Sequence, residues 1–329
     1  MAKLITGGTG FIGAELARAL VRQGERVVVF DIAPNYARLD DIENQVKVVQ
    51  GNLANWHEVL NVVKENDIEG IYHLGSMLSV PSEANPWASF QANVCGTMYV
   101  LEAARLFGVK TIVFSSSITT YALGVTEVVN DETIQCPTTM YGCGKVYCEL
   151  LGRFYRRKFG LDFRSVRCPS VIGPGVKTPG VAQFYSWMIE HAAQGKAYEC
   201  YVTEEAKMPI IYIKDAVKST NMLYQAPKEQ INTVNYNVAG VNPTLSAKEL
   251  ELAIKKYIPE VQVTYKPDPE VTEFYRTFRV QVFDDSKARE EWGWTASYPD
   301  FDKLVVDFIE EMHSHPKRYG ISNKVFMVR

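Results

Sequence analysis

The sequence lacks the features that mark membrane proteins, disulfide-bonded secreted proteins and nucleic-acid-binding proteins. No apolar run approaches the ~20 residues that a membrane-spanning helix needs, and no signal-peptide pattern precedes Lys3–Thr6. The six cysteines form no CxxC pair and have no zinc-type spacing with the five histidines, so we expect reduced thiols and no metal site. A net charge of −3 gives no electrostatic reason to bind nucleic acid. We therefore expect a cytoplasmic protein whose partners include neither nucleic acid nor membrane.

Short β-branched runs alternate with longer segments of helical periodicity through the first half of the 329-residue chain. The runs predict buried parallel strands at Leu4–Thr6, Val27–Phe30, Val46–Val49, Ile71–Leu74, Thr111–Ser115 and Phe163–Arg167. The segments between them predict helices at Phe11–Gln23, Phe90–Phe107 and Met140–Lys158. Strands that alternate with helices build βαβ units, so we expect an α/β protein with a Rossmann-type doubly wound parallel sheet.

The pattern changes after Pro169. Residues 173–180 are dense in glycine and proline, which predicts a loop or a crossing between domains. Beyond them we expect short strands at Met208–Ile213, Val234–Val238 and Val261–Tyr265 and helices at Val181–Gln194, Asp215–Tyr224 and Ala247–Tyr257. We expect residues 1–170 to form the larger domain, rejoined by residues 211–240. Residues 171–210 and 241–329 are expected to form a second, smaller α/β substrate lobe over the mouth of the sheet.

A glycine-rich turn follows the first predicted strand directly. Gly7, Gly10 and Gly13 have the spacing G-x-x-G-x-x-G, and Phe11 and Ile12 open the helix that follows. Glycines at these points permit a tight turn and a close approach of the backbone to a pyrophosphate, which faces the N-terminus of the helix. The position between a strand and a helix predicts that these five residues bind a dinucleotide.

Asp31 ends the second predicted strand, 18 positions after Gly13. A carboxylate there accepts hydrogen bonds from both ribose hydroxyls of NAD and repels the 2′-phosphate of NADP. The neighbouring Ile32 offers no cation to that phosphate, and Arg38 is the next cation along the chain. We therefore expect NAD as the cofactor. The alternatives are NADP and a simple turn role for Asp31.

Tyr141 and Lys145 are four residues apart on a predicted helix and so share one face. The fifth predicted strand runs into Ser115–Ser117, which places hydroxyl groups at the carboxyl edge of the sheet, where open α/β folds bind ligands. A phenol exchanges a proton with a carbinol oxygen once a nearby ammonium group favours the phenolate. A serine hydroxyl hydrogen-bonds that oxygen as charge develops on it. We expect Ser117, Tyr141 and Lys145 to be catalytic, with the hydride passing to NAD.

Together these motifs resemble the extended short-chain dehydrogenase/reductase family, which includes the nucleotide-sugar epimerases. The matching segments are Thr6–Gly13, Asp31, His73–Ser76, Asn93–Thr97, Ser115–Ser117, Tyr141 with Lys145, and Arg167–Pro169. The resemblance implies that Ser117, Tyr141 and Lys145 are catalytic and that the last two also meet the cofactor. It implies further cofactor contacts from Asn52, Leu53, Leu74, Gly75, Ser76, Asn93, Pro169 and Val171. Position 52 usually carries Asp in that family, so Asn52 is a departure beside the adenine.

Within that family the likeness is strongest to the epimerase-like L-threonine 3-dehydrogenases and runs nearly end to end. It implies substrate contacts from Ser79, Ser117, Tyr141 and Thr178. It breaks at Thr178–Val181, where those enzymes carry Thr-Thr-Asp-Tyr and only Thr178 matches. It breaks again at Phe274–Arg279, which replaces a stretch that contains tryptophan. The two arginines gained there, Arg276 and Arg279, suit a carboxylate, sulfonate or phosphate on the substrate, or else belong to a solvated face.

The sequence therefore predicts an NAD-dependent dehydrogenase for a secondary alcohol of a small polar substrate, either L-threonine or a related hydroxy acid or sulfonate. The main alternative is a nucleotide-sugar 4-epimerase, which uses the same Ser/Tyr/Lys set but returns the hydride to its substrate. Met208–Ile213 lacks the Arg-Asp-Phe run that is typical of those epimerases, which favours the dehydrogenase.

Two further classes are disfavoured. A 4,6-dehydratase places an Asp-Glu pair where this chain has Ile118 and Thr119. A non-catalytic NAD-binding protein has no use for the Tyr/Lys pair. The family resemblance also implies a homodimer, built on the predicted helices that begin at Phe90 and at Met140.

Overall fold

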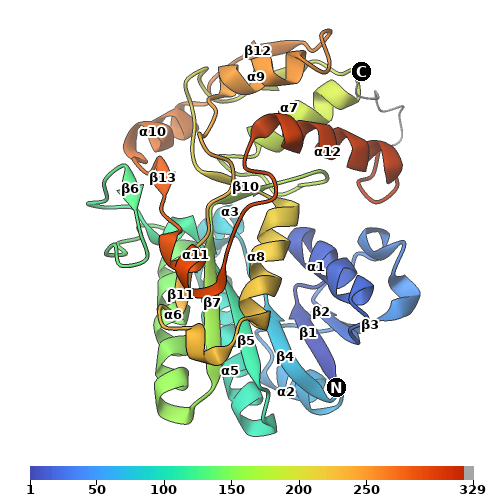
Figure 1. The fold of residues 1–329 in the computed structure, drawn as a ribbon, viewed down its shortest axis with the longest axis vertical. Helices are drawn as coiled ribbons and strands as arrows, with labels where there is room; N and C mark the ends of the chain where they lie inside the picture. The colour runs from blue at the N-terminus through green and yellow to red at the C-terminus, as the bar shows by residue number, and fades with distance from the viewer. Residues whose placement is uncertain (322–329) are drawn as a thin grey trace.

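The computed structural model describes residues 1–321, and one parallel sheet lies at its centre (Figure 1). In spatial order the seven strands of that sheet are β11 (Asn235–Asn237), β7 (Asp162–Cys168), β5 (Thr111–Ser117), β4 (Ile68–His73), β1 (Ala2–Thr6), β2 (Val27–Asp31) and β3 (Val46–Gln50). Every neighbouring pair in it is parallel. The predicted doubly wound sheet of Rossmann type is confirmed, and each strand predicted in the first half overlaps one of these.

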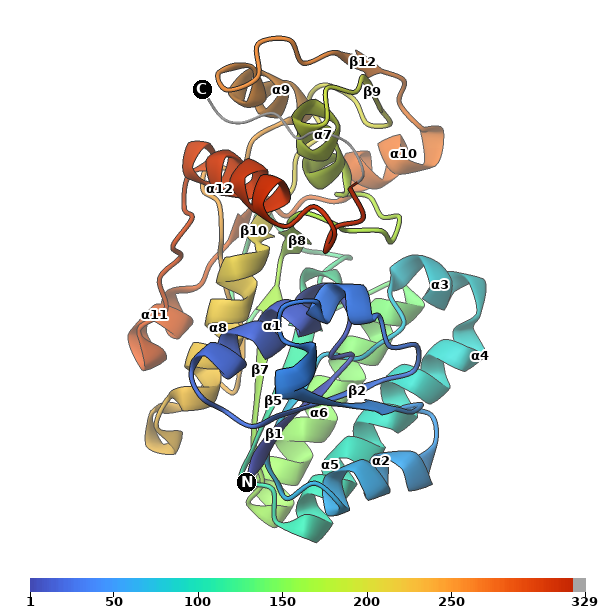
Figure 2. The ribbon, with the colours of Figure 1, turned by 90° about the vertical axis from the view of Figure 1, so that its right-hand side faces the viewer.

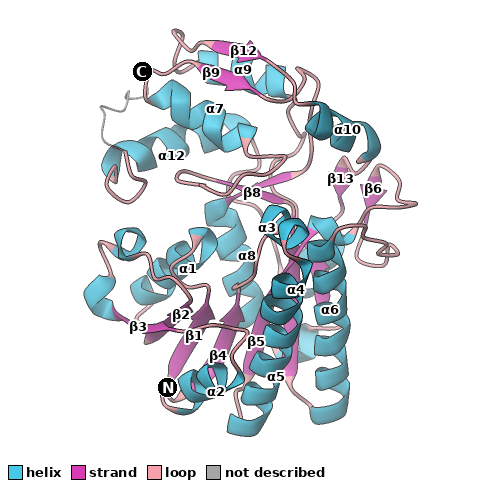
Figure 3. Ribbon diagram, turned by 180° about the vertical axis from the view of Figure 1, so that it is seen from behind, coloured by secondary structure: helices cyan, strands magenta, loops and turns pink. Residues whose placement is uncertain are grey.

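Helices cover both faces of the sheet (Figures 2 and 3). One face carries α1 (Phe11–Arg22), α8 (Ile213–Gln225) and α11 (Ser286–Trp292), and the other carries α2 (Trp56–Lys64), α5 (Gly96–Phe107) and α6 (Met140–Phe159). Apolar burial drives this arrangement, since α1 for example buries Leu16, Ala17 and Leu20 almost completely. The three layers leave the carboxyl edge of the strands as the place for a site.

The predicted helix 90–107 is not one uniform helix. After α3 (Ser79–Ala84) and α4 (Pro86–Ser89), the chain forms a π-helical turn over Phe90–Cys95 and only then continues as α5. Apolar periodicity does not distinguish a single π-helical turn from an α-helix. The sequence therefore predicts one continuous helix over both segments.

A second lobe lies over the carboxyl edge of the sheet (Figures 1 and 2). It contains α7 (Phe184–Ala193), α9 (Ala247–Lys255), α10 (Pro269–Thr277), α12 (Phe301–Ser314) and the parallel pair of β9 (Tyr198–Cys200) with β12 (Val263–Tyr265). Two more parallel pairs lie near the junction, β8 (Ser170–Ile172) with β10 (Ile210–Tyr212) and β6 (Val128–Val129) with β13 (Val282–Phe283). Short 3-10 turns cover Tyr36–Leu39, Glu43–Gln45, Ile118–Thr120 and Lys228–Gln230.

The chain returns from the second lobe to the large lobe at both β11 and α11. β11 joins the large sheet beside β7, and α11 then returns to the same lobe from the second one. Ala288 and Trp292 of α11 are buried there, and the Trp292 ring meets Tyr236 of β11 edge to face at 5.7 Å between centroids. Residues 286–294 thus pack with the large lobe, whereas we had expected all of 241–329 in the smaller one.

Local sequence sets the ends of α6, which carries two of the predicted catalytic residues. The Thr139 hydroxyl accepts a hydrogen bond from the Gly142 N–H at 3.1 Å, and Gly160 ends the helix in the left-handed conformation with φ 72°. The carboxylate of Glu83, on α3, accepts from the Met140 N–H at 2.7 Å. The start of α6 is therefore held both by its own cap and by a neighbouring helix.

A buried ion pair ties α6 to the sheet. The guanidinium of Arg167 on β7 donates to both carboxylate oxygens of Glu149 on α6, with the closest contact at 2.6 Å. The Ser116 hydroxyl also donates to Glu149, and Arg167 donates to the Tyr121 hydroxyl at 2.8 Å. Burial opposes the charge on Arg167, yet its hydrogen bonds to Glu149 keep its pKa above the ordinary value.

Arg167→Met is expected to lower the free energy of unfolding by about 3–5 kcal/mol, because it leaves the Glu149 carboxylate buried without its counter-charge. Urea unfolding followed by circular dichroism measures the loss. Lys256→Met is the control, since it removes an ion pair with Asp302 whose side chains are 60% and 49% exposed, and should cost less than ~1 kcal/mol. Equal losses in the two variants would contradict the role given to the buried pair.

Candidate active site

The loops after β1 and β4 meet at the point where the strand order reverses. β2 and β3 lie on one side of β1 and β4 lies on the other, so a ligand-binding crevice is expected at the carboxyl ends of β1 and β4. Gly7 has φ +65°, and a Cβ built on it would lie 2.8 Å from the Cα of Gly75. A Cβ on Gly13 would lie 2.1 Å from the Gly7 carbonyl oxygen. Side chains are excluded at both points, because the backbone of the turn packs closely on itself and on the loop after β4.

The start of α1 offers unpaired N–H groups beside these glycines. Gly10 is the N-cap residue, and it has no side chain that could accept a hydrogen bond from the N–H groups of the first turn. The first turn of α1 also contains no acidic residue. The N–H groups of Phe11, Ile12 and Gly13 have no partner within the helix, because the first turn of an α-helix leaves them free. Free N–H groups and the positive end of the helix dipole fit a pyrophosphate. The turn therefore fits the dinucleotide that the sequence predicts.

The carboxylate of Asp31, at the end of β2, is fixed by a residue of the glycine turn. Its Oδ2 accepts from the Thr9 N–H at 3.1 Å and from the Thr9 hydroxyl at 2.8 Å. The same hydroxyl accepts from the Asn35 N–H at 3.1 Å, and Asp31 Oδ1 accepts from the Ala33 N–H at 3.2 Å. Thr9 is 2% exposed whereas Asp31 is half-buried, so Asp31 is held from the inside and still reaches the surface.

Arg38, the cation weighed as a partner for a 2′-phosphate, is engaged elsewhere. Its guanidinium donates to the Gly175 carbonyl at 2.5 Å and lies 5.8 Å from the ring centroid of Phe11. A 2′-phosphate would have to compete with these contacts and with the charge of Asp31. The arrangement favours NAD over NADP.

Asn52 and Leu53 lie in the loop after β3, where Leu53 packs against Gly75 and Gly96. A Cβ on Gly75 would lie 2.8 Å from Leu53 Cδ1, and one on Gly96 would lie 2.9 Å from Leu53 Cβ. The amide oxygen of Asn52 accepts from the Ala54 N–H at 2.9 Å. The Asn52 side chain thus shapes the turn that presents Leu53, a role that its amide oxygen fills as an aspartate oxygen would.

The other residues expected near the nicotinamide gather at the same edge. Leu74, Gly75 and Ser76 directly follow β4, and the Gly75 N–H donates to the hydroxyl of Thr6 on β1 at 3.0 Å. Pro169 links β7 to β8, and Val171 of β8 packs against the cores of both lobes. These residues occupy the junction between the sheet and the second lobe.

The Asn93 side chain holds the loop after β4. It lies buried in the π-helical turn, where its amide accepts from the Met77 N–H at 2.7 Å and donates to the Met77 carbonyl at 2.9 Å. The amide also donates to the Ser89 hydroxyl at 3.2 Å. Its polar atoms are therefore turned toward the loop, so Asn93 positions the wall of the crevice from behind.

His73 is a structural residue of the strand rather than a proton carrier. Its ring nitrogens pair with the hydroxyls of Thr6 at 2.7 Å and Thr97 at 3.0 Å. Burial, followed by the nearby charge of Lys145, lowers the pKa of His73 to about 3. The imidazole is therefore neutral at physiological pH and joins β1, β4 and α5.

The three predicted catalytic residues gather where β5 ends and α6 begins. The ammonium of Lys145, 3% exposed, donates to the Ser115 carbonyl at 2.5 Å and lies 5.2 Å from the ring centroid of Tyr141. A Cβ on Gly142 would lie 2.4 Å from the Thr119 carbonyl oxygen, so α6 touches the turn after Ser117.

The hydroxyls of Ser117 and Tyr141 are available to a substrate. Ser117 accepts from the N–H and the hydroxyl of Thr119 at 3.2 and 3.0 Å, which leaves its own proton free to be donated. The Tyr141 hydroxyl has no hydrogen-bond partner within residues 1–321. A donor and a proton acceptor therefore face the same edge of the sheet, as oxidation of a carbinol requires.

The predicted substrate residues lie on two separate segments. Ser79 opens α3, directly after the loop that follows β4, and Thr178 lies in the loop between β8 and α7. That second loop is tied to α10, since the Tyr275 hydroxyl donates to the Val181 carbonyl at 2.9 Å. Sequence reasoning missed both Tyr275 and Glu83, which fix the elements that carry Thr178 and Ser79.

Arg276 and Arg279, which the sequence analysis considered together, are both exposed but have different neighbours. Arg276 forms an ion pair with Glu273 on the same helix at 2.6 Å, and their side chains are 72% and 58% exposed. It belongs to a solvated face. Arg279 follows α10 and is also exposed, beside Phe278 and Val280, which pack against the residues after Ser117.

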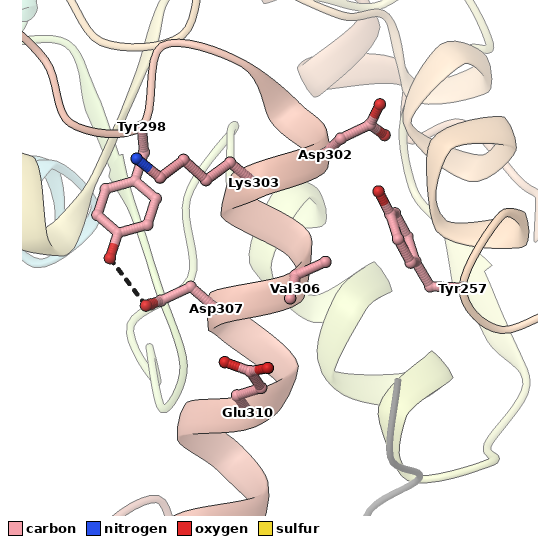
Figure 4. A pocket seen from close by; sticks show the side chains of 7 residues that line it. All are labelled: Tyr257, Tyr298, Asp302, Lys303, Val306, Asp307 and Glu310. Carbon is pink, nitrogen blue, oxygen red and sulfur yellow. Dashed lines mark hydrogen bonds between the residues drawn. The ribbon is translucent and has the colours of Figure 1, made fainter. Parts of the chain in front are cut away.

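A separate pocket lies on the outer side of the second lobe (Figure 4). Its lining comes mainly from α12, with Tyr257 and Tyr298, and the Tyr298 hydroxyl donates to Asp307 at 2.8 Å. It includes none of the predicted site residues. Within residues 1–321 no cluster of metal-ligating side chains occurs, and no helix is long and apolar enough to cross a membrane.

Comparison with known proteins places this geometry in context. A family model described as the NAD dependent epimerase/dehydratase family matches residues 3–239. The mitochondrial L-threonine 3-dehydrogenase of Bos taurus is 31% identical over 328 residues, which cover 97% of this chain and 84% of that protein.

Solved structures agree with the sequence comparison. The holo form of a GalE-like L-threonine dehydrogenase from Cupriavidus necator is 29% identical with a TM-score of 0.87, covering 95% of this chain and all of that one. A UDP-glucose 4-epimerase from Thermotoga maritima, 22% identical with a TM-score of 0.80 over 95% of this chain and 99% of that one, shares the fold.

Thr9→Val is expected to weaken NAD binding by about 10- to 100-fold, because it removes a hydrogen bond to the charged Asp31 carboxylate while keeping the branched shape. Isothermal titration with NAD, in the absence of substrate, measures the change. Thr9→Ser retains the hydroxyl and should bind as the unaltered protein does. Unchanged NAD affinity in Thr9→Val would show that Asp31 needs no such support.

Proposed function

The chain belongs to the NAD-dependent epimerase/dehydratase family, and on that premise we propose that it is a dehydrogenase of a small polar secondary alcohol. L-threonine is the first candidate substrate, followed by related hydroxy acids and sulfonates. The observation that carries the proposal is the buried Lys145 ammonium, anchored on the Ser115 carbonyl beside Tyr141 and the free Ser117 hydroxyl.

We assign the proton chemistry to three side chains. Tyr141 accepts the proton of the substrate hydroxyl, and the ammonium of Lys145 lies beside its ring, 5.2 Å from the centroid. Ser117 donates a hydrogen bond to the substrate oxygen and keeps its proton, since its lone pairs already accept from Thr119. NAD, when bound, accepts the hydride.

NAD would be held at the carboxyl ends of four strands, β1, β2, β4 and β7, and by the loops that follow them. In this proposal the pyrophosphate meets Gly7, Gly10 and the first turn of α1, and the adenosine ribose meets Asp31. The nicotinamide side is formed by the loop after β4 and by the link from β7 to β8. Ser79 at the start of α3 and Thr178 in the loop between β8 and α7 would contact the substrate from two separate segments.

The alternative reaction is 4-epimerisation of a nucleotide sugar with tightly bound NAD. It uses the same Ser/Tyr/Lys set, and the similarity to a UDP-glucose 4-epimerase extends over nearly the whole fold at 22% identity. L-threonine dehydrogenases are about 30% identical to this chain, more than the UDP-glucose 4-epimerase, which favours net oxidation.

A substrate panel separates these reactions. With NAD and L-threonine, the absorbance band of reduced nicotinamide should rise in proportion to substrate consumed. A rise only with other hydroxy acids or with hydroxysulfonates would exclude L-threonine as the substrate but retain the assignment as a dehydrogenase. Conversion of a UDP-sugar without net reduction of NAD would establish the epimerase instead.

Tyr141→Phe is expected to lower kcat by about 10²- to 10⁴-fold with the best substrate of the panel, because the variant cannot take the hydroxyl proton. The matched control is Tyr257→Phe in the second lobe, which lines the separate pocket described above and should leave kcat unchanged. Steady-state formation of reduced nicotinamide measures both. Full activity in Tyr141→Phe would refute the assignment.

We also propose that a second copy of this chain covers the outer faces of α5 and α6. Large apolar side chains are exposed on these helices and on the π-helical turn before α5, namely Phe90, Met98, Leu106, Phe107, Tyr147, Leu150, Phe154 and Phe159. The two helices pack against each other and against the sheet, and their outer faces point away from the sheet (Figure 3). Such a continuous apolar face, paired about a twofold axis, forms a self-complementary interface.

Leu150→Glu is expected to convert the dimer into a monomer, because Leu150 is 59% exposed on α6 and the variant would bury a charge in the apolar interface of each copy. Light scattering coupled to gel filtration gives the mass. Leu252→Glu, at a residue 53% exposed on α9, is the control and should stay dimeric. A monomeric mass for the unaltered protein would rule out the interface.

A further inference from the structure

The chain returns to the nucleotide-binding lobe after α12. Arg318 and Tyr319 follow that helix and are only 4% and 5% exposed. The Arg318 guanidinium lies 3.3 Å from Asp40 and 3.0 Å from Asp41, both in the loop after β2, and 3.0 Å from Glu311 of α12. One side chain near the end of the described chain therefore joins carboxylates of both lobes.

The charges around Arg318 are balanced by other pairs. Asp41 also pairs with Arg18 of α1 at 2.9 Å, and Glu311 also pairs with Lys214 of α8 at 3.1 Å. These partners remain when Arg318 is replaced, so neither carboxylate is left without a counter-charge. The tie between the lobes can thus be removed with less damage than the Glu149–Arg167 pair, in which Glu149 has no second ion-pair partner among the described residues.

Tyr319 secures the loop between β8 and α7. A Cβ on Gly175 would lie 2.7 Å from the Tyr319 ring, and Gly175 has φ +80°, so the ring fits against bare backbone. The Tyr319 hydroxyl donates to Glu311 at 3.0 Å, and its carbonyl accepts from the ammonium of Lys177 at 3.3 Å. The same loop is held from the other side by Arg38, which donates to the Gly175 carbonyl.

Both segments joined in this way border the predicted NAD crevice. Asp40 and Asp41 lie in the loop that begins after Asp31, on the ribose side. A Cβ on Gly173 would lie 3.2 Å from Cζ of Phe11, so the loop that Tyr319 secures lies against the first residue of α1. The ring of Phe11 thus stands between Gly173 and the Arg38 guanidinium.

We infer that Arg318 and Tyr319 form a clasp that positions the two walls of the NAD crevice and sets the rate at which the dinucleotide leaves. With the clasp closed, the loop after β2 and the loop after β8 are held together across the start of α1. Release of NAD or NADH then requires these buried contacts to open. Arg318 and Tyr319 are positioning residues, since neither is assigned a contact with the substrate or the reacting atoms.

The inference rests on the placement of NAD proposed above, and the dissociation rate of NADH tests it. Stopped-flow fluorescence follows displacement of bound NADH by excess NAD, with no alcohol present. Arg318→Met is expected to raise the dissociation rate at least tenfold. Arg318→Lys, which keeps one charge but cannot span three carboxylates, should give an intermediate rate.

Tyr319→Ala tests the same clasp without altering any charge, and it decides the matter if Arg318→Met does not fold. It should also raise the NADH dissociation rate at least tenfold, whereas Tyr319→Phe keeps the ring on Gly175 and should have a smaller effect. Lys256→Met, at an exposed ion pair of the same lobe, is the control.

A second readout separates positioning from general loosening of the fold. At saturating NAD, the KM for the alcohol should be unchanged in the clasp variants, while the Kd for NAD rises with the dissociation rate. An NADH dissociation rate equal to that of the unaltered protein, in folded Arg318→Met or Tyr319→Ala, would overturn the clasp. Absence of NADH binding by the unaltered protein would instead overturn the proposed function.

Discussion

The buried contact between the Lys145 ammonium and the Ser115 carbonyl is the constraint on which the site depends. An ammonium group that is 3% exposed is unfavourable unless it is satisfied, and its partners here are that carbonyl and the rings of Phe114 and Tyr141. One helical turn later, Glu149 is bound by Ser116, the next residue of β5. Two successive strand residues thus fix two successive turns of α6, and the helix cannot slide along the sheet.

This fixed register determines what is presented at the carboxyl edge. The turn of α6 before Lys145 carries Tyr141, and the strand residue after Ser116 is Ser117, so the two hydroxyls needed for proton transfer are brought to the same edge. Glu83 holds the start of α6 from α3, and Asn93 holds the loop after β4 from the π-helical turn. The proposed chemistry relies on this support because catalytic geometry tolerates little displacement.

The sequence alone predicted the parallel sheet, the glycine turn and the Ser/Tyr/Lys set, because each depends on local periodicity or on a short motif. It did not predict β6, β8, β9 or β13, whose two or three residues are too few to show a period. The support from Thr9 to Asp31 and from Glu83 to Met140 was invisible because it depends on contacts across 22 and 57 positions. The sequence could not show whether Arg276 lies in the pocket or on a solvated face. An arginine suits both a substrate anion and an exposed ion pair such as the one with Glu273.

Transfer of the hydrogen from the carbinol carbon is the most direct test of the account. L-threonine deuterated at that carbon would be incubated with the protein and NAD, and both molecules analysed by NMR. Deuterium is expected to appear in the reduced nicotinamide while the substrate becomes the ketone, at a slower rate than for unlabelled L-threonine. If no deuterium reached the nicotinamide with L-threonine or any other alcohol of the panel, or if it returned to an inverted carbon of a UDP-sugar without net reduction, the central claim would be contradicted.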